Sequence, residues 1–527
     1  MRLASLSILS FFFFELQCGE SARILGVFPL AGKSVNILYN RLMKGLADAG
    51  HDVTLISSYK NKLPIVNGSY TDVVLTGFTE DYEALLNRGH FLDAHEDYPI
   101  SAVNDYFNYF LFIWNNTFKH PNVRKMLKTS QKFDIVLTEY FWNDCLEIFA
   151  HIYDCTVVMF TSMGGVNPWV NDRVGNYLQA SSASHFFMLG DYSKGMTFIE
   201  RIHNLAYYLY DYYHKYFVII PGNNAILQHN FPNPPDVSTF YEKISIVLLG
   251  SHSSLRQPIP LAPNMVEIGG FHLDPPKKLP KDIQTILDGA KNGVIFFSMG
   301  SHVKSSDFSE EKRKIFLNVF MKLDQIVLWK FEDDNLPGKP DNVHIRKWLP
   351  QMDLLAQPNI RLFITHGGYG SLQETIYHGV PVLTIPCFAD QYNNAYLAVQ
   401  LGYALKLSYN DKNFNEDTLY SLIQELLNNP QYRENAKTRS RLFHDRPMKP
   451  LDTAIYWIEY AIRNKGAPHL RLSALDIPFY KLYNIDIYLF FILKLSYCEA
   501  QFVPVQNILA PLKFGNVVTI QNGTMWE

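Results

Sequence analysis

A buried strand, an amphipathic helix and a second buried strand follow one another near the start of this chain, and the pattern begins again after residue 290. Residues 23–29 form the first predicted strand, Leu38 to Ala49 carry an apolar stripe at helical spacing, and residues 53–56 form the next strand. Gly50 ends the predicted helix. Because strand–helix–strand units build parallel sheets, the pattern predicts an α/β fold.

The same alternation continues along both halves of the chain. The further strands are predicted at 133–138, 156–160, 293–298, 326–329, 361–365 and 380–385. Ser309 is the expected cap of a helix whose apolar face runs over 315–323. A chain of 527 residues is too long for one compact core, so we expect two doubly wound domains.

Composition divides the chain into five segments. The Pro- and Lys-rich stretch at 274–283 is the expected linker between a domain at 23–273 and a second domain at 284–480. Residues 1–22 precede the first domain, and residues 481–527 form a tail.

The N-terminus is typical of a secretory signal peptide. Arg2 is followed by an apolar run from Leu3 to Phe14, and Gly19-Glu20-Ser21 offers a cleavage site. We therefore expect the chain in the secretory pathway, in the lumen of the endoplasmic reticulum. Glycosylation triplets begin at Asn67, Asn115 and Asn522, which agrees weakly with that location.

Charge and cysteine content narrow the function classes. Lys and Arg number 47 against 50 Asp and Glu, so the net charge of −3 gives no reason to expect a nucleic-acid partner. The five cysteines are too few for a disulfide scaffold, and their spacing fits no metal site. A Cys145–Cys155 disulfide and buried free thiols both stay open, with free thiols favoured.

The segment 348–395 places glycine and polar residues after two successive predicted strands. The strand at 361–365 ends at His366, and Gly367 and Gly368 lead into a predicted helix. Glycines let the backbone approach a ligand closely, and the amides at the start of a helix attract an anion. This turn therefore predicts a phosphate site.

Other side chains of this segment suit the rest of a nucleotide sugar. Ser371 can donate to a phosphate, and Glu374 follows on the same helix face, where its carboxylate can hold two ribose hydroxyls. Trp348 offers a flat face to a base. Asp390 and Gln391, after the next strand, offer an acceptor and an amide to sugar hydroxyls.

This segment resembles the nucleotide-sugar signature of the UDP-glycosyltransferases, the family that includes microsomal UDP-glucuronosyltransferases. The likeness extends over 23–480, includes Phe297-Ser298-Met299-Gly300-Ser301, and in detail resembles the invertebrate members. It implies the GT-B fold, in which two Rossmann-like domains face each other across a cleft, with the acceptor on the first and the donor on the second. It also implies inverting transfer of glucose or glucuronate from UDP-glucose or UDP-glucuronate to a small lipophilic acceptor, without a metal or a bound cofactor.

The resemblance implies a role for each donor-site residue. Trp348 stacks on uracil beside Gln351, Glu374 holds the ribose, and Asp390 and Gln391 hold the transferred sugar. The residues that face the diphosphate are Ser298, Ser301, His366, Gly368, Gly370 and Ser371.

The loop after the first strand departs from the family pattern. An acceptor hydroxyl needs a positioned base, and the family uses a histidine in this loop, oriented by a carboxylate. In the run 32–36 the histidine position is Val35, which cannot accept a proton. The orienting acid is expected after the strand at 133–138, where Asp144, the preferred candidate, and Glu139 lie.

Three interpretations of this departure stay open. In the first, the enzyme is inactive or very slow on alcohols, and at the limit the chain is a non-catalytic binder of UDP-sugars. Alternatively, it acts on readily ionised phenols or on amines, which need little help. In the third interpretation another residue is the base, with Lys33, Glu139 and Asp144 as candidates, whereas His51 lies at the far end of the helix and is expected to be structural.

Aromatic residues crowd two segments of the first half, and an apolar pocket built from them would suit a lipophilic acceptor. Core packing explains any single one of them equally well. The residues are Tyr106, Phe107, Tyr109, Phe110, Phe112, Trp114, Tyr207, Tyr208, Tyr210, Tyr212, Tyr213 and Tyr216.

The tail at 481–527 differs from the family, whose members usually end in a membrane-spanning helix. Its apolar run Ile487–Leu493 is bounded by Asp486 and Lys494, whereas a span needs about 20 apolar residues. We therefore expect a chain that lies free in the lumen or attaches to a membrane only peripherally, and that is compatible with an oligomer.

Overall fold

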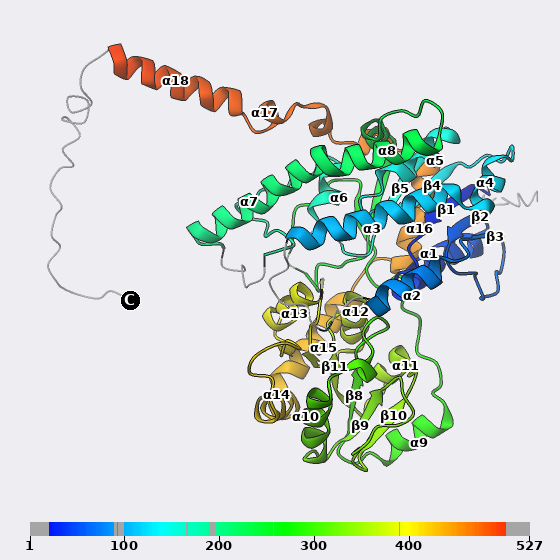
Figure 1. Cartoon of the computed structure of the whole chain (residues 1–527), viewed down its shortest axis with the longest axis vertical. Helices are drawn as coiled ribbons and strands as arrows, with labels where there is room; N and C mark the ends of the chain where they lie inside the picture. Colours follow the sequence, from blue (N-terminus) through cyan, green and yellow to red (C-terminus); the bar gives the residue numbers. More distant parts are fainter. Residues whose placement is uncertain are drawn as a thin grey trace, which may run out of the picture. The chain divides into compact units, whose positions relative to one another are not determined.

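The computed structural model describes residues 21–88, 92, 100–164, 167–188, 195–256, 258–388 and 390–501. Residues 1–20 of the predicted signal peptide and the triplet at Asn522 lie outside the described residues, as does the Tyr106 side chain. The described chain up to Arg471 forms one compact unit that contains two parallel sheets (Figure 1), and residues from Leu472 onward form another.

The first sheet has parallel strands in the order β3-β2-β1-β4-β5-β6-β7. The strands are β1 Arg23–Phe28, β2 Asp52–Ser57, β3 Ser69–Val74, β4 Ile135–Glu139, β5 Thr156–Thr161, β6 Ile244–Leu249 and β7 Met265–Glu267. Side chains alternate between its faces: Leu25 and Val27 pack in one core, Ile24 and Phe28 in the other. Both faces of the sheet are therefore buried, as its nearly uninterrupted apolar strands require.

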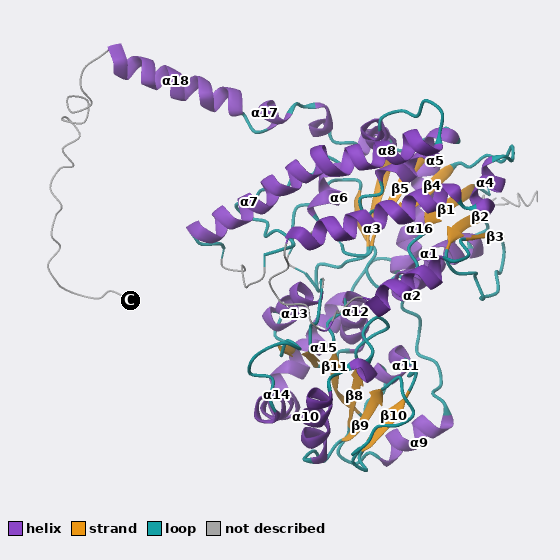
Figure 2. Cartoon of the chain, in the orientation of Figure 1, coloured by secondary structure: helices purple, strands orange, loops and turns teal. Residues whose placement is uncertain are grey.

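Helices cover these faces (Figure 2). They are α1 Lys33–Asp48, α2 Phe78–Arg88, α3 Ile100–Lys119, α4 Pro121–Leu127, α5 Ile148–Ile152, α6 Pro168–Arg173, α7 Phe198–His214 and α8 Ile220–Asn230, with a π-helical turn at Lys215–Ile219. The predicted end of α1 is confirmed, because Gly50 follows it with a φ of +106°.

The second sheet has parallel strands in the order β10-β9-β8-β11-β12-β13. Its strands are β8 Val294–Ser298, β9 Ile326–Lys330, β10 Val343–Arg346, β11 Ile360–Thr365, β12 Val382–Thr384 and β13 Ala404–Lys406. Its helices are α9 Lys281–Gly289, α10 Glu310–Met321, α11 Gln351–Leu355, α12 Tyr369–His378, α13 Gln391–Gln400, α14 Glu416–Asn428 and α15 Pro430–His444. The predicted cap of α10 is confirmed, because the Lys312 N–H donates to Ser309 Oγ at 3.2 Å.

One late helix returns to the first sheet. Helix α16 (Pro450–Arg463) presents Ala454, Ile458 and Ala461 to the same core as Ile24 and Phe28. In Figure 1 it is the orange helix among the blue and cyan elements. In the predicted division of the chain these residues belong to the second domain, and α9 begins inside the stretch expected to be the linker.

The second unit contains a 3₁₀ turn at Ser473–Asp476, α17 (Phe479–Leu482) and α18 (Ile485–Gln501). Within the described part of the chain, none of the helices combines the length and apolar character that crossing a membrane requires.

Candidate active site

A cavity of about 1000 Å³ is lined by residues that follow the carboxyl ends of strands in both sheets. From the first sheet come the loops after β1, β4 and β5, and from the second the loops after β8, β11 and β12. Ligands of open parallel sheets bind at these ends. The two walls of this cavity differ in chemistry and are described in turn.

The donor wall belongs to the second sheet, and it brings together every residue that the sequence analysis assigns to the UDP-sugar. These are Ser298, Ser301, Trp348, Gln351, His366, Gly368, Gly370, Ser371, Glu374, Asp390 and Gln391. They come from four separate places along the chain, 298–301, 348–351, 366–374 and 390–391, so the fold and not their spacing alone gathers them.

His366 lies at the end of β11, held between two glycines. A Cβ atom on Gly300 would lie 2.4 Å from His366 Cε1, and one on Gly368 would lie 2.4 Å from His366 Nε2. No larger residue fits at either position without moving the ring. Burial, His302 and Lys330 lower the pKa of His366 to about 3, so its imidazole is neutral at physiological pH.

The start of α12 carries a hydrogen-bonded group suited to ribose. The Gln351 amide donates to Glu374 Oε2 at 2.6 Å and to Ser371 Oγ at 3.0 Å. Burial raises the pKa of Glu374 to about 7, with the Gln351 hydrogen bond acting in the opposite direction. A cavity-lining carboxylate in this position can accept from hydroxyl groups of a ligand.

Gly370 differs from the glycines beside His366. A Cβ atom there would meet no protein atom within 4 Å. Protein packing therefore does not require glycine at this position, and the open space lies over the first turn of α12, where backbone amides attract an anion.

The loop before α13 presents a carboxyl and an amide to the cavity. Asp390 accepts from Asn394 Nδ2 at 2.7 Å, and Gln391 Oε1 accepts from the Cys387 N–H at 2.9 Å. Burial raises the pKa of Asp390. Because the Gln391 side-chain oxygen accepts this hydrogen bond, its NH₂ group is the part that can donate to a ligand.

The rim of the donor wall carries an indole and an ammonium group. The Trp348 side chain is 67% exposed, which leaves a ring face open for a base. Lys330, at the end of β9, donates to Gly300 O at 2.9 Å, pairs with Glu332 at 2.6 Å, and lies 5.9 Å from the Trp348 ring centroid. The sequence analysis missed Lys330, although its place at the end of a predicted strand was a usable signal.

The acceptor wall is aromatic and comes from the first half. Of the described aromatic residues named in the sequence analysis, Phe110 and Tyr207 line the cavity, whereas Phe107 and Trp114 are buried in the protein core. The aromatic residues that the sequence analysis missed are Tyr82, Tyr140, Phe141, Trp142, Trp169, Phe186 and Phe187. Tyr140, Phe141 and Trp142 directly follow β4. Because ligands bind at the carboxyl ends of parallel strands, their position also indicates a place in the site.

Val35 lines the cavity at the start of α1, at the position that the resemblance assigns to a histidine. The two acids expected near it are directed elsewhere. Glu139 accepts from the Tyr39 hydroxyl and from the Ser162 N–H, and burial raises its pKa to about 7.

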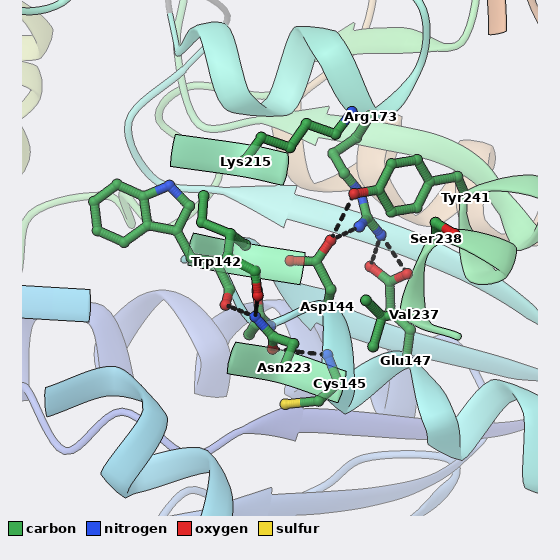
Figure 3. A network of polar contacts seen from close by, with 12 residues as sticks. Trp142, Asp144, Cys145, Glu147, Arg173, Lys215, Asn223, Val237, Ser238 and Tyr241 are labelled. Carbon is green, nitrogen blue, oxygen red and sulfur yellow. Dashed lines mark hydrogen bonds and ion pairs between the residues drawn. The ribbon is translucent and has the colours of Figure 1, made fainter. Parts of the chain in front are cut away.

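Asp144 is part of a buried ionic cluster. Figure 3 shows the Arg173 guanidinium between the carboxylates of Asp144 and Glu147, with the Tyr241 hydroxyl donating to Asp144 Oδ1 at 3.0 Å. Arg173 and both acids are fully buried. Asp144 therefore has a cationic partner in this structure, and it is absent from the described cavity wall.

The other predicted features have contrasting surroundings. Asn67 is exposed, whereas Asn115 lies within α3, accepts from Asn230 at 2.9 Å and is followed by a fully buried Thr117. Glycosylation stays a prediction at both positions.

Cys145, Cys155 and Cys387 are buried free thiols.

Comparisons with known proteins agree with this geometry. A family described as UDP-glucoronosyl and UDP-glucosyl transferase matches residues 39–513. UDP-glycosyltransferase UGT5 of Dactylopius coccus is 35% identical over 480 residues, or 90% of this chain and 89% of that protein. UDP-glucuronosyltransferase 2B10 of Homo sapiens is 30% identical over 497 residues, or 91% of each.

Solved glycosyltransferase structures share the fold. A UDP-glucosyltransferase from Polygonum tinctorium, described as capable of glucosylating indoxyl, covers 84% of this chain and 99% of its own, with a TM-score of 0.55 at 17% identity. This likeness shows that the fold is GT-B, as the sequence resemblance implied.

Proposed function

This chain belongs to the UDP-glucoronosyl and UDP-glucosyl transferase family, and we propose that it transfers glucose or glucuronate from a UDP-sugar to a small lipophilic acceptor with inversion. The observation that carries the proposal is the convergence of all the expected donor residues on one wall of a single cavity. An aromatic wall faces them from the other half of the chain.

The donor wall suits each part of a UDP-sugar. The exposed face of Trp348 takes the uracil, and the carboxylate of Glu374 takes the ribose hydroxyls. The diphosphate lies over Gly370, against the first amides of α12 and the neutral imidazole of His366. Asp390 and Gln391 then hold the hydroxyls of the transferred sugar.

Transfer requires that the bond between the anomeric carbon and the phosphate breaks as the acceptor oxygen attacks. The departing UDP gains negative charge, and the Lys330 ammonium and the helix amides stabilise that charge. The aromatic wall binds the apolar body of the acceptor and excludes water, which would otherwise compete for the sugar.

A second candidate function follows from Val35. Its side chain reaches the cavity but cannot accept a proton. In this alternative the chain binds UDP-sugars without transferring the sugar. The N-terminal signal sequence supports a location in the lumen of the endoplasmic reticulum for either function.

Calorimetry with UDP and a transfer assay separate the two functions. We expect the purified full chain to bind UDP and to glycosylate a phenol from UDP-glucose or UDP-glucuronate, and binding without transfer to any acceptor would favour the second. Glu374→Ala and His366→Ala should each weaken UDP binding at least about tenfold, since each removes a buried polar contact. Glu416→Ala, which changes an exposed surface ion pair, is the control. Unchanged affinity in the first two variants would contradict the donor site.

A further inference from the structure

The cavity has to supply a group that takes the proton of an acceptor hydroxyl, and Val35 does not. Glu139 and Asp144 are engaged by Tyr39 and Arg173, and Lys33, the third candidate, pairs with Glu83 at 4.0 Å. The carboxylates on the donor wall face the ribose and the sugar under the proposed function. Histidines therefore become the next candidates, and those among the described wall residues are His203, His272, His302 and His366.

Three of these imidazoles are poorly placed. His366 is enclosed by Gly300 and Gly368, on the phosphate side of the cavity. His272 packs edge-on against the neighbouring Phe271 ring, with the centroids 5.6 Å apart, and lies near the Arg41 cation. His203 has an exposed side chain on α7. The three atoms nearest to a Cβ on Gly32, at the start of α1, belong to Val35, His302 and Tyr82, and so to none of these three histidines.

His302 lies in the loop after β8. Its imidazole reaches the start of α1, which belongs to the opposite half of the chain. A Cβ atom on Gly32 would lie 3.2 Å from Val35 Cγ2 and 3.5 Å from His302 Nε2. The imidazole nitrogen and the valine methyl group therefore lie around the same point, at the start of α1. Tyr82 holds the ring edge-on, with the centroids 5.8 Å apart.

The hydrogen bond on the other side of the ring is compatible with the tautomer that a proton acceptor at Nε2 requires. Ser301 Oγ lies 3.3 Å from His302 Nδ1. With the proton on Nδ1, that nitrogen donates to the serine oxygen, and Nε2 keeps its lone pair on the Gly32 side. The ring is then oriented as a proton acceptor towards the start of α1, where Val35 lies.

We propose that His302 is the general base of this transferase and replaces, from the second half of the chain, the histidine that Val35 displaces in the first. The acceptor O–H gives its proton to His302 Nε2 while its oxygen lone pair forms the bond to the anomeric carbon of the UDP-sugar. The bond from that carbon to the phosphate oxygen breaks, and its electron pair leaves with UDP. This inference rests on the proposed function, because it assigns a residue within the same reaction.

The charged and titratable groups around His302 come from several elements. They are Lys33 at the start of α1, Tyr82 on α2 and His366 after β11, together with Lys330, whose ammonium donates to Gly300 O two residues before His302. Burial, with Lys33, lowers the pKa of His302. The imidazole is therefore neutral and able to accept a proton at neutral pH.

The experiment compares acceptors that differ in their need for a base. His302→Gln should lower kcat for an aliphatic alcohol at least about 100-fold, the usual contribution of a general base. For a nitrophenol, which ionises near neutral pH, the loss should stay below about tenfold, and UDP affinity should change less than about twofold. The wild-type kcat/KM should fall at low pH with an inflection below that of an ordinary histidine, and the variant should lack this inflection.

Further variants keep the test decisive. Val35→His in the His302→Gln background should restore alcohol transfer, added imidazole should partly restore it in His302→Ala, and His344→Gln on β10 should change nothing. Equal losses for both acceptors, or retained alcohol transfer in His302→Gln, would overturn the role of His302. If the wild type binds UDP but transfers sugar to no acceptor, the transferase function fails as well, and if it does not bind UDP, the donor site itself is wrong.

Discussion

The two walls of the cavity were recognisable to very different degrees. Most of the donor wall comes from 348–391, where glycines and polar residues follow strand ends in a fixed order. The acceptor wall collects aromatic residues from loops and helices spread between Tyr82 and Tyr207. A wall built from one segment can be found from its motif, whereas a dispersed wall emerges only once the sheet brings its loops together.

The difference extends to how tightly each wall constrains its residues. The donor wall contains positions where one added methyl group would collide with the buried His366 ring, as at Gly300 and Gly368. The acceptor wall consists of aromatic contacts that tolerate exchange of one apolar group for another. We therefore expect mutations on the donor wall to have the larger effects.

The largest effect is expected from Gly300→Ala. This residue has a φ of +80°, and its new Cβ would lie 2.4 Å from His366 Cε1, so the ring must move. We expect UDP affinity to fall about 100-fold, or roughly 2.7 kcal/mol, measured by calorimetry.

Gly338→Ala is the matched control for backbone strain. Gly338 has a φ of +76°, but its Cβ would lie 4.0 Å from the nearest atom, on Leu317. It should lower the melting temperature and leave UDP affinity nearly unchanged. Equal loss of affinity in both variants would mean that strain, and not the collision with His366, causes the effect.

The second effect concerns the charge of Lys330. Lys330→Met keeps the length of the buried stem but removes the ammonium beside the expected diphosphate. UDP affinity should fall about tenfold while uridine affinity changes little, because uridine carries no phosphate. Lys322→Met on the surface, where Lys322 pairs with Glu416, should alter neither affinity. A parallel loss for uridine would place Lys330 away from the phosphates.

The third effect depends on pH. Because burial raises the pKa of Glu374 to about 7, this carboxyl is protonated below that pH and charged above it. UDP affinity should therefore weaken roughly fivefold from about pH 8 to pH 6, as the charged acceptor for ribose is lost. Glu374→Gln should bind UDP weakly at both pH values and should not show this change of affinity with pH. An identical pH dependence in the variant would exclude Glu374 as its source.

The smallest effect is expected on the acceptor wall. Phe187→Leu exchanges one apolar group for another in the cavity, so the acceptor KM should rise about two- to threefold with UDP affinity unchanged. Phe217→Leu, at an exposed site on the π-helical turn, is the control. A change in UDP affinity with Phe187→Leu would break the distinction between the walls.

Local patterns account for much of the fold and little of the acceptor wall. The apolar runs that became β1, β2, β4, β5, β8, β9 and β11 were strong enough to be identified alone. Strand β12 was also predicted, within 380–385. Strand β3 carries partly exposed, polar residues, and β7 and β13 are only three residues long, so periodicity is weak there. The partnership of Asp144 with Arg173 could not be predicted, since a buried ion pair between separate elements leaves no local signal.

Helix α16 has a consequence for how the molecule can be divided. The polypeptide passes from the first sheet to the second near Asp274 and returns before Pro450, so two connecting segments join the halves. A fragment ending at residue 273 would lack the helix that covers Ile24 and Phe28. It would therefore expose this apolar face of the first sheet to water. The first half is therefore incomplete without α16, and swapping halves between relatives to exchange acceptor preference requires that this helix be transferred with the first half.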